Sequence, residues 1–220
     1  MITFSNKVIS KIIGFLFVAA ILAYGIGYGM IEPLITAPSY FSQIAAHKNQ
    51  VLIGLSLMLL NSVFVIGIAA LFFPILKKYN KNIAFIYLST RVIEALLLAT
   101  GVFLILYLLL LSNQYLMTTP VGKLYFQNLG SLAIKYNELY YQMAMAILSL
   151  GSLFFCYLLK QSKLIPSFLA IWGLLGYAVL FLGAALEILG FKGVGLILCI
   201  PGGLFEIFFA GWLIVKGLKN

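Results

Sequence analysis

Six apolar runs, each of about 20 residues or more, dominate this sequence and limit what it can fold into. A run of that length is what an α-helix needs to cross the hydrocarbon core of a bilayer. Backbone groups in hydrocarbon must find their hydrogen bonds within the segment, so such runs form helices. The sequence therefore predicts an all-α bundle of six transmembrane helices in a single integral membrane domain, residues 1–220. The spans are expected at about residues 12–31, 51–76, 83–111, 139–159, 167–189 and 196–215.

Composition supports a membrane protein and excludes several other classes. Of the 220 residues, 64% are hydrophobic and only 9% are charged, whereas soluble domains carry about 25% charged residues. The net charge of +9 does not point to nucleic acid, because the lysines are scattered between apolar runs and form no basic face. With His47 as the only histidine and no cysteine cluster, a zinc site of the usual nitrogen and sulfur type is excluded. We expect neither a metal nor another cofactor.

The connections between the runs differ in length and character. The first, residues 32–50, contains two prolines, and Ser39 is a candidate cap for a short interfacial helix. The third, residues 112–138, is the longest, and it carries apolar residues at helical spacing, which predicts a helix lying on the membrane surface or running straight into the fourth span. The bundle is therefore expected to have short interfacial helices in its first and third connections. The spaced residues are Tyr125, Leu129, Leu132 and Tyr136.

The distribution of lysines predicts the orientation of the bundle in the membrane. Lysine and arginine concentrate in the cytoplasmic loops of membrane proteins. With six spans, nine lysines fall on the side of the two termini and four on the other side, so both termini are expected in the cytoplasm. The nine are Lys7, Lys11, Lys77, Lys78, Lys81, Lys160, Lys163, Lys216 and Lys219, and the four are Lys48, Lys123, Lys135 and Lys192.

Polar residues inside the apolar runs mark a candidate centre. Arg91, the only arginine, lies three residues before Glu94, so the two share one face of a helix. At about 1.5 Å of rise per residue, Arg91 lies about 15 Å from the cytoplasmic surface, and Glu206 on the sixth span lies at a similar depth. Asn61, on the second span, falls in an adjacent layer. We expect these four groups to meet, with Arg91 touching Glu206.

Three interpretations of this centre remain open. It is a buried site that binds an ion or a polar head group, or an ion pair and an amide that hold three helices together. In the third interpretation, the long third span slides outward until the Arg91 side chain reaches the membrane interface.

Glycines and one proline mark further features of the spans. Pro201, Gly202 and Gly203 are expected to interrupt the sixth helix, because proline removes a backbone hydrogen bond. Broken helices line the sites of many transporters, although a kink filled by neighbouring side chains is the simpler outcome. Gly25 and Gly29 form a small-xxx-small step at which another helix is expected to approach closely.

These features support three hypotheses about function. The first is a non-catalytic bundle whose polar centre binds a membrane lipid or a small hydrophobic ligand. The second is a proton- or ion-coupled transporter that uses Glu94 and Glu206, and the third is an intramembrane enzyme that modifies lipid. The catalytic signal is thin, because the chain has no aspartate and no nucleophile elbow, so no catalytic residue is assigned.

A series of short motifs runs through the chain: Asn61, Phe73-Pro74, Arg91, Glu94, Gln161-Ser162-Lys163, Pro166, Trp172-Gly173, Pro201, Glu206, Trp212-Leu213-Ile214 and Lys216-Gly217. In the order and spacing of these motifs, the chain resembles bacterial membrane proteins of the domain-of-unknown-function 4386 (DUF4386) family. The resemblance extends over nearly the whole chain and implies a multi-pass protein of the bacterial inner membrane, but it supplies no activity. Members of that family often carry a carboxylate shortly before the asparagine, whereas Met58 and its neighbours here are apolar.

Overall fold

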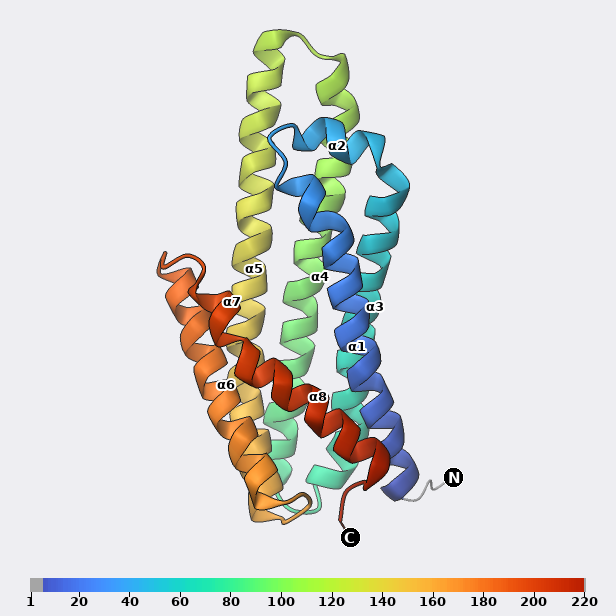
Figure 1. The fold of residues 1–220 in the computed structure, drawn as a ribbon, viewed down its shortest axis with the longest axis vertical. Coiled ribbons are helices and arrows are strands. Elements are labelled where there is room, and N and C mark those ends of the chain that lie inside the picture. The colour runs from blue at the N-terminus through green and yellow to red at the C-terminus, as the bar shows by residue number, and fades with distance from the viewer. Residues whose placement is uncertain (1–5, 220) are drawn as a thin grey trace.

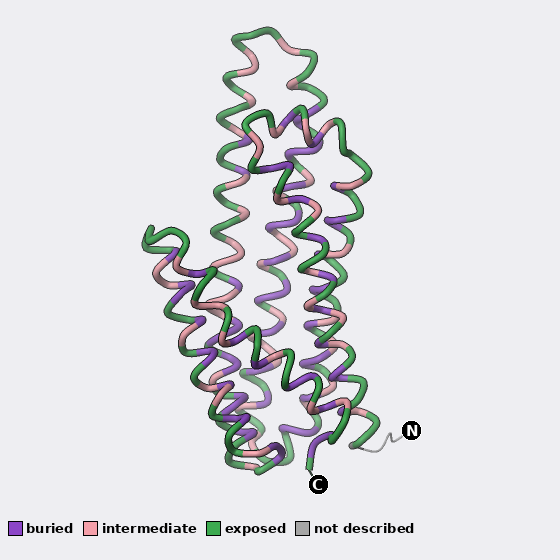
Figure 2. The backbone as a smooth tube through the Cα atoms, in the orientation of Figure 1, coloured by how far each residue is buried: buried purple, intermediate pink, exposed green. Residues whose placement is uncertain are grey.

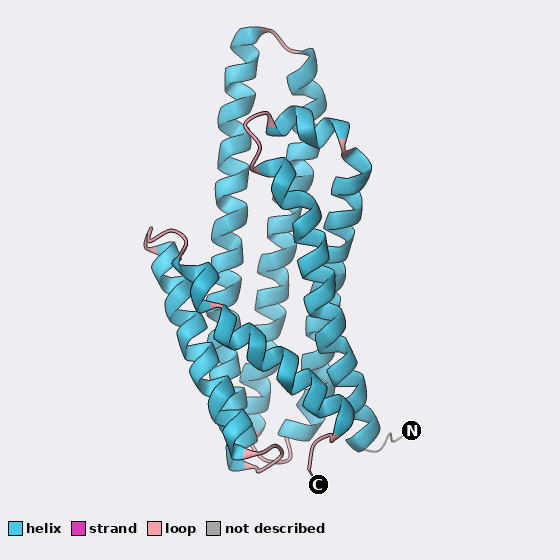
Figure 3. Ribbon diagram, in the orientation of Figure 1, coloured by secondary structure: helices cyan, strands magenta, loops and turns pink. Residues whose placement is uncertain are grey.

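The computed structural model, which describes residues 6–219, is built almost entirely of helices (Figure 3). Six of its helical segments are long and apolar enough to cross a membrane, which confirms the predicted all-α bundle of six transmembrane helices. The helices are α1 (Asn6–Ile35), α2 (Tyr40–Ala46), α3 (Lys48–Leu76), α4 (Lys81–Met117), α5 (Pro120–Gln161), α6 (Ser167–Ile188), α7 (Val194–Leu198) and α8 (Ile200–Val215).

The connections follow the sequence only in part. The short helix expected in the first connection is α2. In the third connection, α4 runs on to Met117 and α5 starts at Pro120, so the expected short helix is the first part of α5, continuous with the fourth span. Thr119 caps α5 by accepting a hydrogen bond from the Gly122 backbone, and the ring of Pro120 suits a first helical turn. The sixth span consists of α7 and α8 together.

The hairpin of α4 and α5 is longer than a bilayer requires. The two helices have 37 and 42 residues, or about 55 and 63 Å at the usual helical rise. A membrane with its head groups is about 40–45 Å thick. Figure 1 accordingly shows the tip of this hairpin extending beyond every other helix. We infer that the tip reaches past the membrane surface on the side opposite the termini.

The six spans pack as a closed ring that follows the order of the chain. α1 lies against α3, α3 against α4, α4 against α5, α5 against α6, and α6 against α8, which returns to α1. α8 closes the ring by crossing obliquely in front of the other helices (Figure 1). The start of α1 and the end of α8 lie at one end of the bundle, together with the α3–α4 and α5–α6 turns. This lysine-rich end therefore carries all nine of the lysines assigned to one side.

The strongest core lies in the half of the bundle near the lysine-rich end. There, the helices bury a cluster of five aromatic side chains, which we call the aromatic plug. Ring centroids in this cluster are 4.3–6.2 Å apart, in stacked and edge-to-face arrangements that favour aromatic packing. Figure 2 shows buried residues where the helices face one another, and a mostly exposed α4–α5 tip. The plug consists of Phe72, Tyr87, Phe155, Phe205 and Phe209, all fully buried.

Two glycines bring α1 and α3 together, but they are not the two expected. A methyl group added to Gly27 would lie 2.6 Å from the backbone oxygen of Gly54, and one added to Gly54 would lie 2.8 Å from that of Gly27. Gly25 and Gly29 instead face open space, with no neighbouring atom within 4 Å of such a methyl. The small-xxx-small prediction therefore selected the wrong pair of positions on the correct helix.

The break in the sixth span falls at Cys199, the residue between α7 and α8, just before Pro201. Pro201 itself lies in the first turn of α8, where a missing N–H costs no helical hydrogen bond. Gly202 packs against Gly176 of α6, so closely that a methyl on Gly176 would lie 3.0 Å from the Gly202 Cα atom. Gly203 has open space beside it. Neighbouring backbone, not a ligand site, therefore fills the space at Gly202.

Candidate functional site

A cavity of about 230 Å³, which we call the central cavity, lies between five helices of the ring and is partly open to the surface of the bundle. Its walls come from α1, α3, α4, α5 and α8, and most of them are apolar. All four residues of the predicted polar centre line it, so the structure brings these groups together. They are Asn61, Arg91, Glu94 and Glu206.

Arg91 and Glu94 form a buried ion pair along one turn of α4. The Arg91 Nη1 atom lies 3.1 Å from Glu94 Oε2, and each residue is only 3% exposed. The guanidinium also lies 6.0 Å from the centre of the Tyr87 ring, within the range of a cation–π contact. Burial this deep contradicts the interpretation in which the Arg91 side chain reaches the membrane interface. The Arg91 Nε atom is buried without a hydrogen-bond partner in the described structure.

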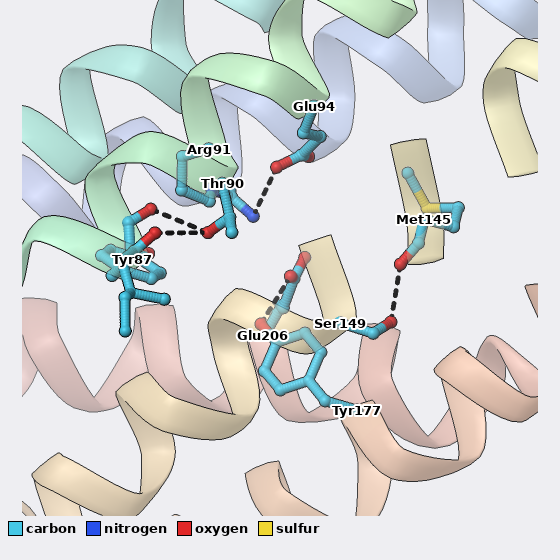
Figure 4. A network of polar contacts seen from close by, with 9 residues as sticks. Tyr87, Thr90, Arg91, Glu94, Met145, Ser149, Tyr177 and Glu206 are labelled. Atoms are coloured by element: carbon cyan, nitrogen blue, oxygen red, sulfur yellow. Dashed lines mark hydrogen bonds and ion pairs between the residues drawn. The ribbon is translucent and has the colours of Figure 1, made fainter. Parts of the chain in front are cut away.

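Glu206 does not pair with Arg91, so the prediction that these two residues touch is wrong. The only ion pair that Arg91 forms in the described part of the chain is with Glu94. Glu206 Oε1 instead accepts a hydrogen bond of 2.8 Å from the hydroxyl of Tyr177 on α6 (Figure 4). Matching depth placed Arg91 and Glu206 in one layer. Depth does not determine the rotation of a helix about its axis, and in α8 that rotation brings Glu206 to Tyr177.

Asn61 contributes an amide without a partner. Its side chain is 6% exposed and lines the central cavity from α3. None of the side-chain hydrogen bonds within residues 6–219 involves Asn61, and its amide is not among the fully buried polar atoms that lack a partner. Because this amide faces the cavity and has both donor and acceptor groups free, the position suits a polar group of a molecule that fills the cavity.

The charges around the central cavity do not balance. Three of its lining residues carry charge: Arg91 is positive, while Glu94 and Glu206 are acidic. The Arg91 charge is compensated by Glu94 at 3.1 Å, whereas the partner of Glu206 is a neutral hydroxyl. With both carboxylates ionised, the cavity therefore carries one negative charge that no described lining residue offsets.

A second cavity, the vestibule, lies beside the first on the side away from the lysine-rich end. It measures about 610 Å³ and is bounded by α1, α5, α6, α7 and the turn between α6 and α7. Its acidic and basic residues are equal in number: Glu138 and Glu187, Lys135 and Lys192. Glu187 accepts a 2.9 Å hydrogen bond from the Gly195 backbone, and Lys192 lies 3.5 Å from Glu138.

Three residues line both cavities and so form the wall between them: Tyr24, Tyr141 and Met145. The two tyrosine rings are stacked, with centroids 5.8 Å apart and planes 23° from parallel. Since Tyr24 belongs to α1 and Tyr141 to α5, this contact bridges the interior of the ring. On the opposite side, Phe72, Tyr87, Phe155 and Phe209 of the aromatic plug lie nearer the lysine-rich end of their helices than the lining residues of the central cavity do.

The tyrosines of this site are not among the residues predicted from the sequence. Tyr177 binds Glu206, and the pair of Tyr24 and Tyr141 separates the two cavities. A tyrosine within an apolar span could have indicated such a contact, because a buried tyrosine hydroxyl usually needs a hydrogen-bond partner. Thirteen tyrosines spread over the chain gave no means of choosing among them. The described residues contain no group of three or more histidine, cysteine or acidic side chains that could hold a metal ion.

Comparison with protein families gives one match, to the family described as "Domain of unknown function (DUF4386)", over residues 12–217. The chain therefore belongs to this family, as the resemblance in its sequence implied. Neither the curated proteins nor the solved structures gave a significant match. The site must accordingly be interpreted from its own chemistry.

Proposed function

We propose that this membrane protein binds a small amphiphilic ligand, a lipid or another small hydrophobic molecule, in its central cavity. The observation that carries the proposal is the unpartnered amide of Asn61 in a cavity shared with two acidic groups and one arginine. The remaining walls are apolar, with residues such as Phe17, Val65 and Leu148. Mostly apolar walls with a few convergent polar groups are the usual features of a small-molecule site.

The size of the cavity limits the ligand. Sites for drug-sized molecules measure about 300–1,000 Å³, and this cavity measures about 230 Å³. It suits a short-chain amphiphile or one part of a larger lipid, and it is too small to enclose a whole phospholipid. A purely structural role would explain the ion pair of Arg91 and Glu94, but not why Asn61 is left without a partner beside an open space.

A transporter that couples movement to protons remains the second candidate. The observation in its favour is the pair of acidic residues, Glu94 and Glu206, on one cavity that adjoins a vestibule. Alternating access also requires a path to the other side of the membrane. On that side the aromatic plug is fully buried and closely packed. Binding with access from one side is therefore the function that this geometry supports better.

A panel of six-carbon amphiphiles tests the proposal. Hexylammonium, 1-hexanol and hexanoate are added to the purified protein in mild detergent, and the melting temperature is measured. We expect at least one of them to raise it, because a ligand that binds only the folded state stabilises it. The variant Asn61→Leu, which fills the polar position with an apolar side chain of similar size, is expected to lose this response.

The matched control is Ser62→Ala, next to Asn61 on the same helix. The Ser62 hydroxyl is buried without a partner and does not line the cavity. This variant is expected to keep the response to the ligand. If no compound stabilises the wild-type protein while Asn61→Leu simply raises its stability, the centre is a dry structural core and the proposal is wrong.

We further propose that the protein acts as a single domain in the bacterial inner membrane, with both termini in the cytoplasm. The nine lysines at the end of the bundle that carries the termini support this orientation. A phosphatase reporter, active only outside the cytoplasm, is expected to work when inserted at residues 118–119. The same reporter is expected to be inactive at the C-terminus and in the 77–81 turn. Activity at the C-terminus would contradict the orientation.

A further inference from the structure

We infer that the ligand of the central cavity is a small organic monocation that enters from the vestibule, past Tyr24 and Tyr141. The inference rests on the proposed binding function and adds the charge of the ligand and its path. Charge, aromatic surroundings and the arrangement of the two cavities support it independently.

The charge of the cavity favours a cation. Glu206 faces a cavity whose only positive residue, Arg91, is already paired with Glu94. A carboxylate in a membrane interior without a positive partner is costly. An ammonium group beside Glu206 would offset that charge and would leave its hydrogen bond with Tyr177 in place. An anion would instead add to the negative charge, and a neutral molecule would not compensate it.

The aromatic surroundings favour the same class of ligand. Tyr24 and Tyr141 line the cavity at the wall that faces the vestibule. Tyrosine rings attract organic cations through the negative face of the π system, most strongly where water is excluded. An alkylammonium ion combines this attraction with an apolar chain that suits the walls of Phe17, Val65 and Leu148.

The arrangement of the cavities supplies the path. The vestibule and the central cavity share Tyr24, Tyr141 and Met145, so a ligand that passes from one space to the other would pass these side chains. The acidic and basic residues of the vestibule are equal in number, so it does not repel a cation by net charge. The aromatic plug lies toward the lysine-rich end, whereas the vestibule lies on the other side of the central cavity. Entry through the vestibule is therefore expected from the side opposite the termini.

Ligand charge is tested with the same three six-carbon compounds in the purified, full-length protein. We expect hexylammonium to bind with a Kd at least about tenfold lower than that of 1-hexanol or hexanoate, because charge-assisted contacts contribute that much or more. Glu206→Gln, which removes the charge and retains an oxygen for Tyr177, should abolish the preference. The control Glu32→Gln, outside both cavities, should keep it.

The results separate this inference from the proposed function. If 1-hexanol or hexanoate binds as tightly as hexylammonium, the cavity binds ligands but the inferred charge is wrong. If none of the three binds, the proposed function fails as well. Should Glu206→Gln fail to fold, the ratio of the Kd values in the wild-type protein still decides the question.

The path is tested by thiol labelling at Ala20, a lining residue of the central cavity on α1. Ala20→Cys is made together with Cys199→Ser, because Cys199 lines the vestibule, while the fully buried Cys156 stays in place. A membrane-impermeant cationic thiosulfonate is applied to vesicles of either orientation. Labelling should be several-fold faster from the side opposite the termini, and hexylammonium should slow it more than 1-hexanol does.

Adding Tyr141→Ala should make this labelling faster than in the protein that retains Tyr141, because it removes one of the two tyrosine rings between the cavities. The matched control is Tyr157→Ala on the same helix, at an exposed position that lines neither cavity. Faster labelling from the side of the termini, or a rate that Tyr141→Ala leaves unchanged, would overturn the inferred path whether or not a ligand binds.

Discussion

Replacing Arg91 by methionine is expected to lower the free energy of unfolding by about 3–5 kcal/mol, since it leaves a buried carboxylate without its partner. Glu94 is 3% exposed, and its contact with Arg91 Nη1 at 3.1 Å is its only ion pair in residues 6–219. In hydrocarbon, no bulk water is available to replace the lost partner. Unfolding in mixed micelles of mild and denaturing detergent would measure the loss.

The double variant Arg91→Met with Glu94→Leu should recover much of this loss, because two apolar side chains can replace a buried ion pair at little cost. The control is the exposed pair of Lys192 and Glu138, 3.5 Å apart. Lys192→Met is expected to change stability by less than about 1 kcal/mol, as is usual for surface pairs. A loss for Arg91→Met no larger than that of the control would show that the buried pair contributes little.

Substituting Gly27 by alanine is expected to destabilise the bundle by about 1–3 kcal/mol, the usual range for overpacking. The new methyl would lie 2.6 Å from the Gly54 carbonyl oxygen, and because this is a backbone atom, α1 and α3 would have to separate. The same unfolding measurement applies. Because α1 also contributes Ala20 and Tyr24 to the central cavity, ligand response should fall together with stability.

Gly29→Ala, on the same helix α1, is the matched control. Gly29 has no neighbouring atom within 4 Å of an added methyl, and it lines neither cavity. Alanine favours a helix over glycine by about 1 kcal/mol, so this variant should be neutral or slightly more stable. Equal losses for Gly27→Ala and Gly29→Ala would contradict the close approach of α1 and α3.

The site as a whole combines features that rarely serve packing alone. A bundle needs neither an unpartnered amide nor an uncompensated carboxylate to hold its helices together, because apolar side chains do so at lower cost. Asn61 and Glu206 nevertheless line the same cavity, which also borders the pair of Tyr24 and Tyr141. The two boundaries differ, because the aromatic plug is closely packed whereas Tyr24 and Tyr141 also line the vestibule. The two sides of the cavity are therefore not equivalent across the membrane.

The sequence by itself determined the number of spans and the polar residues of the centre. Hydrocarbon requires long apolar helices, and it makes each polar group inside them stand out. Asn61, Arg91, Glu94 and Glu206 are therefore identifiable from their positions within the apolar runs, and their depth follows from helical rise. Depth along a helix axis follows from counting residues, which needs no tertiary information.

Only the tertiary structure decided which partners these groups have. The rotation of each helix about its axis depends on how its side chains pack against neighbouring helices. In a span that is apolar on all sides, the sequence does not indicate which face is turned toward the bundle. This is why Glu206 contacts Tyr177 instead of Arg91, and why Gly27 rather than Gly25 meets α3. The two cavities likewise arise from residues on helices distant in the chain, which the ring of spans brings together.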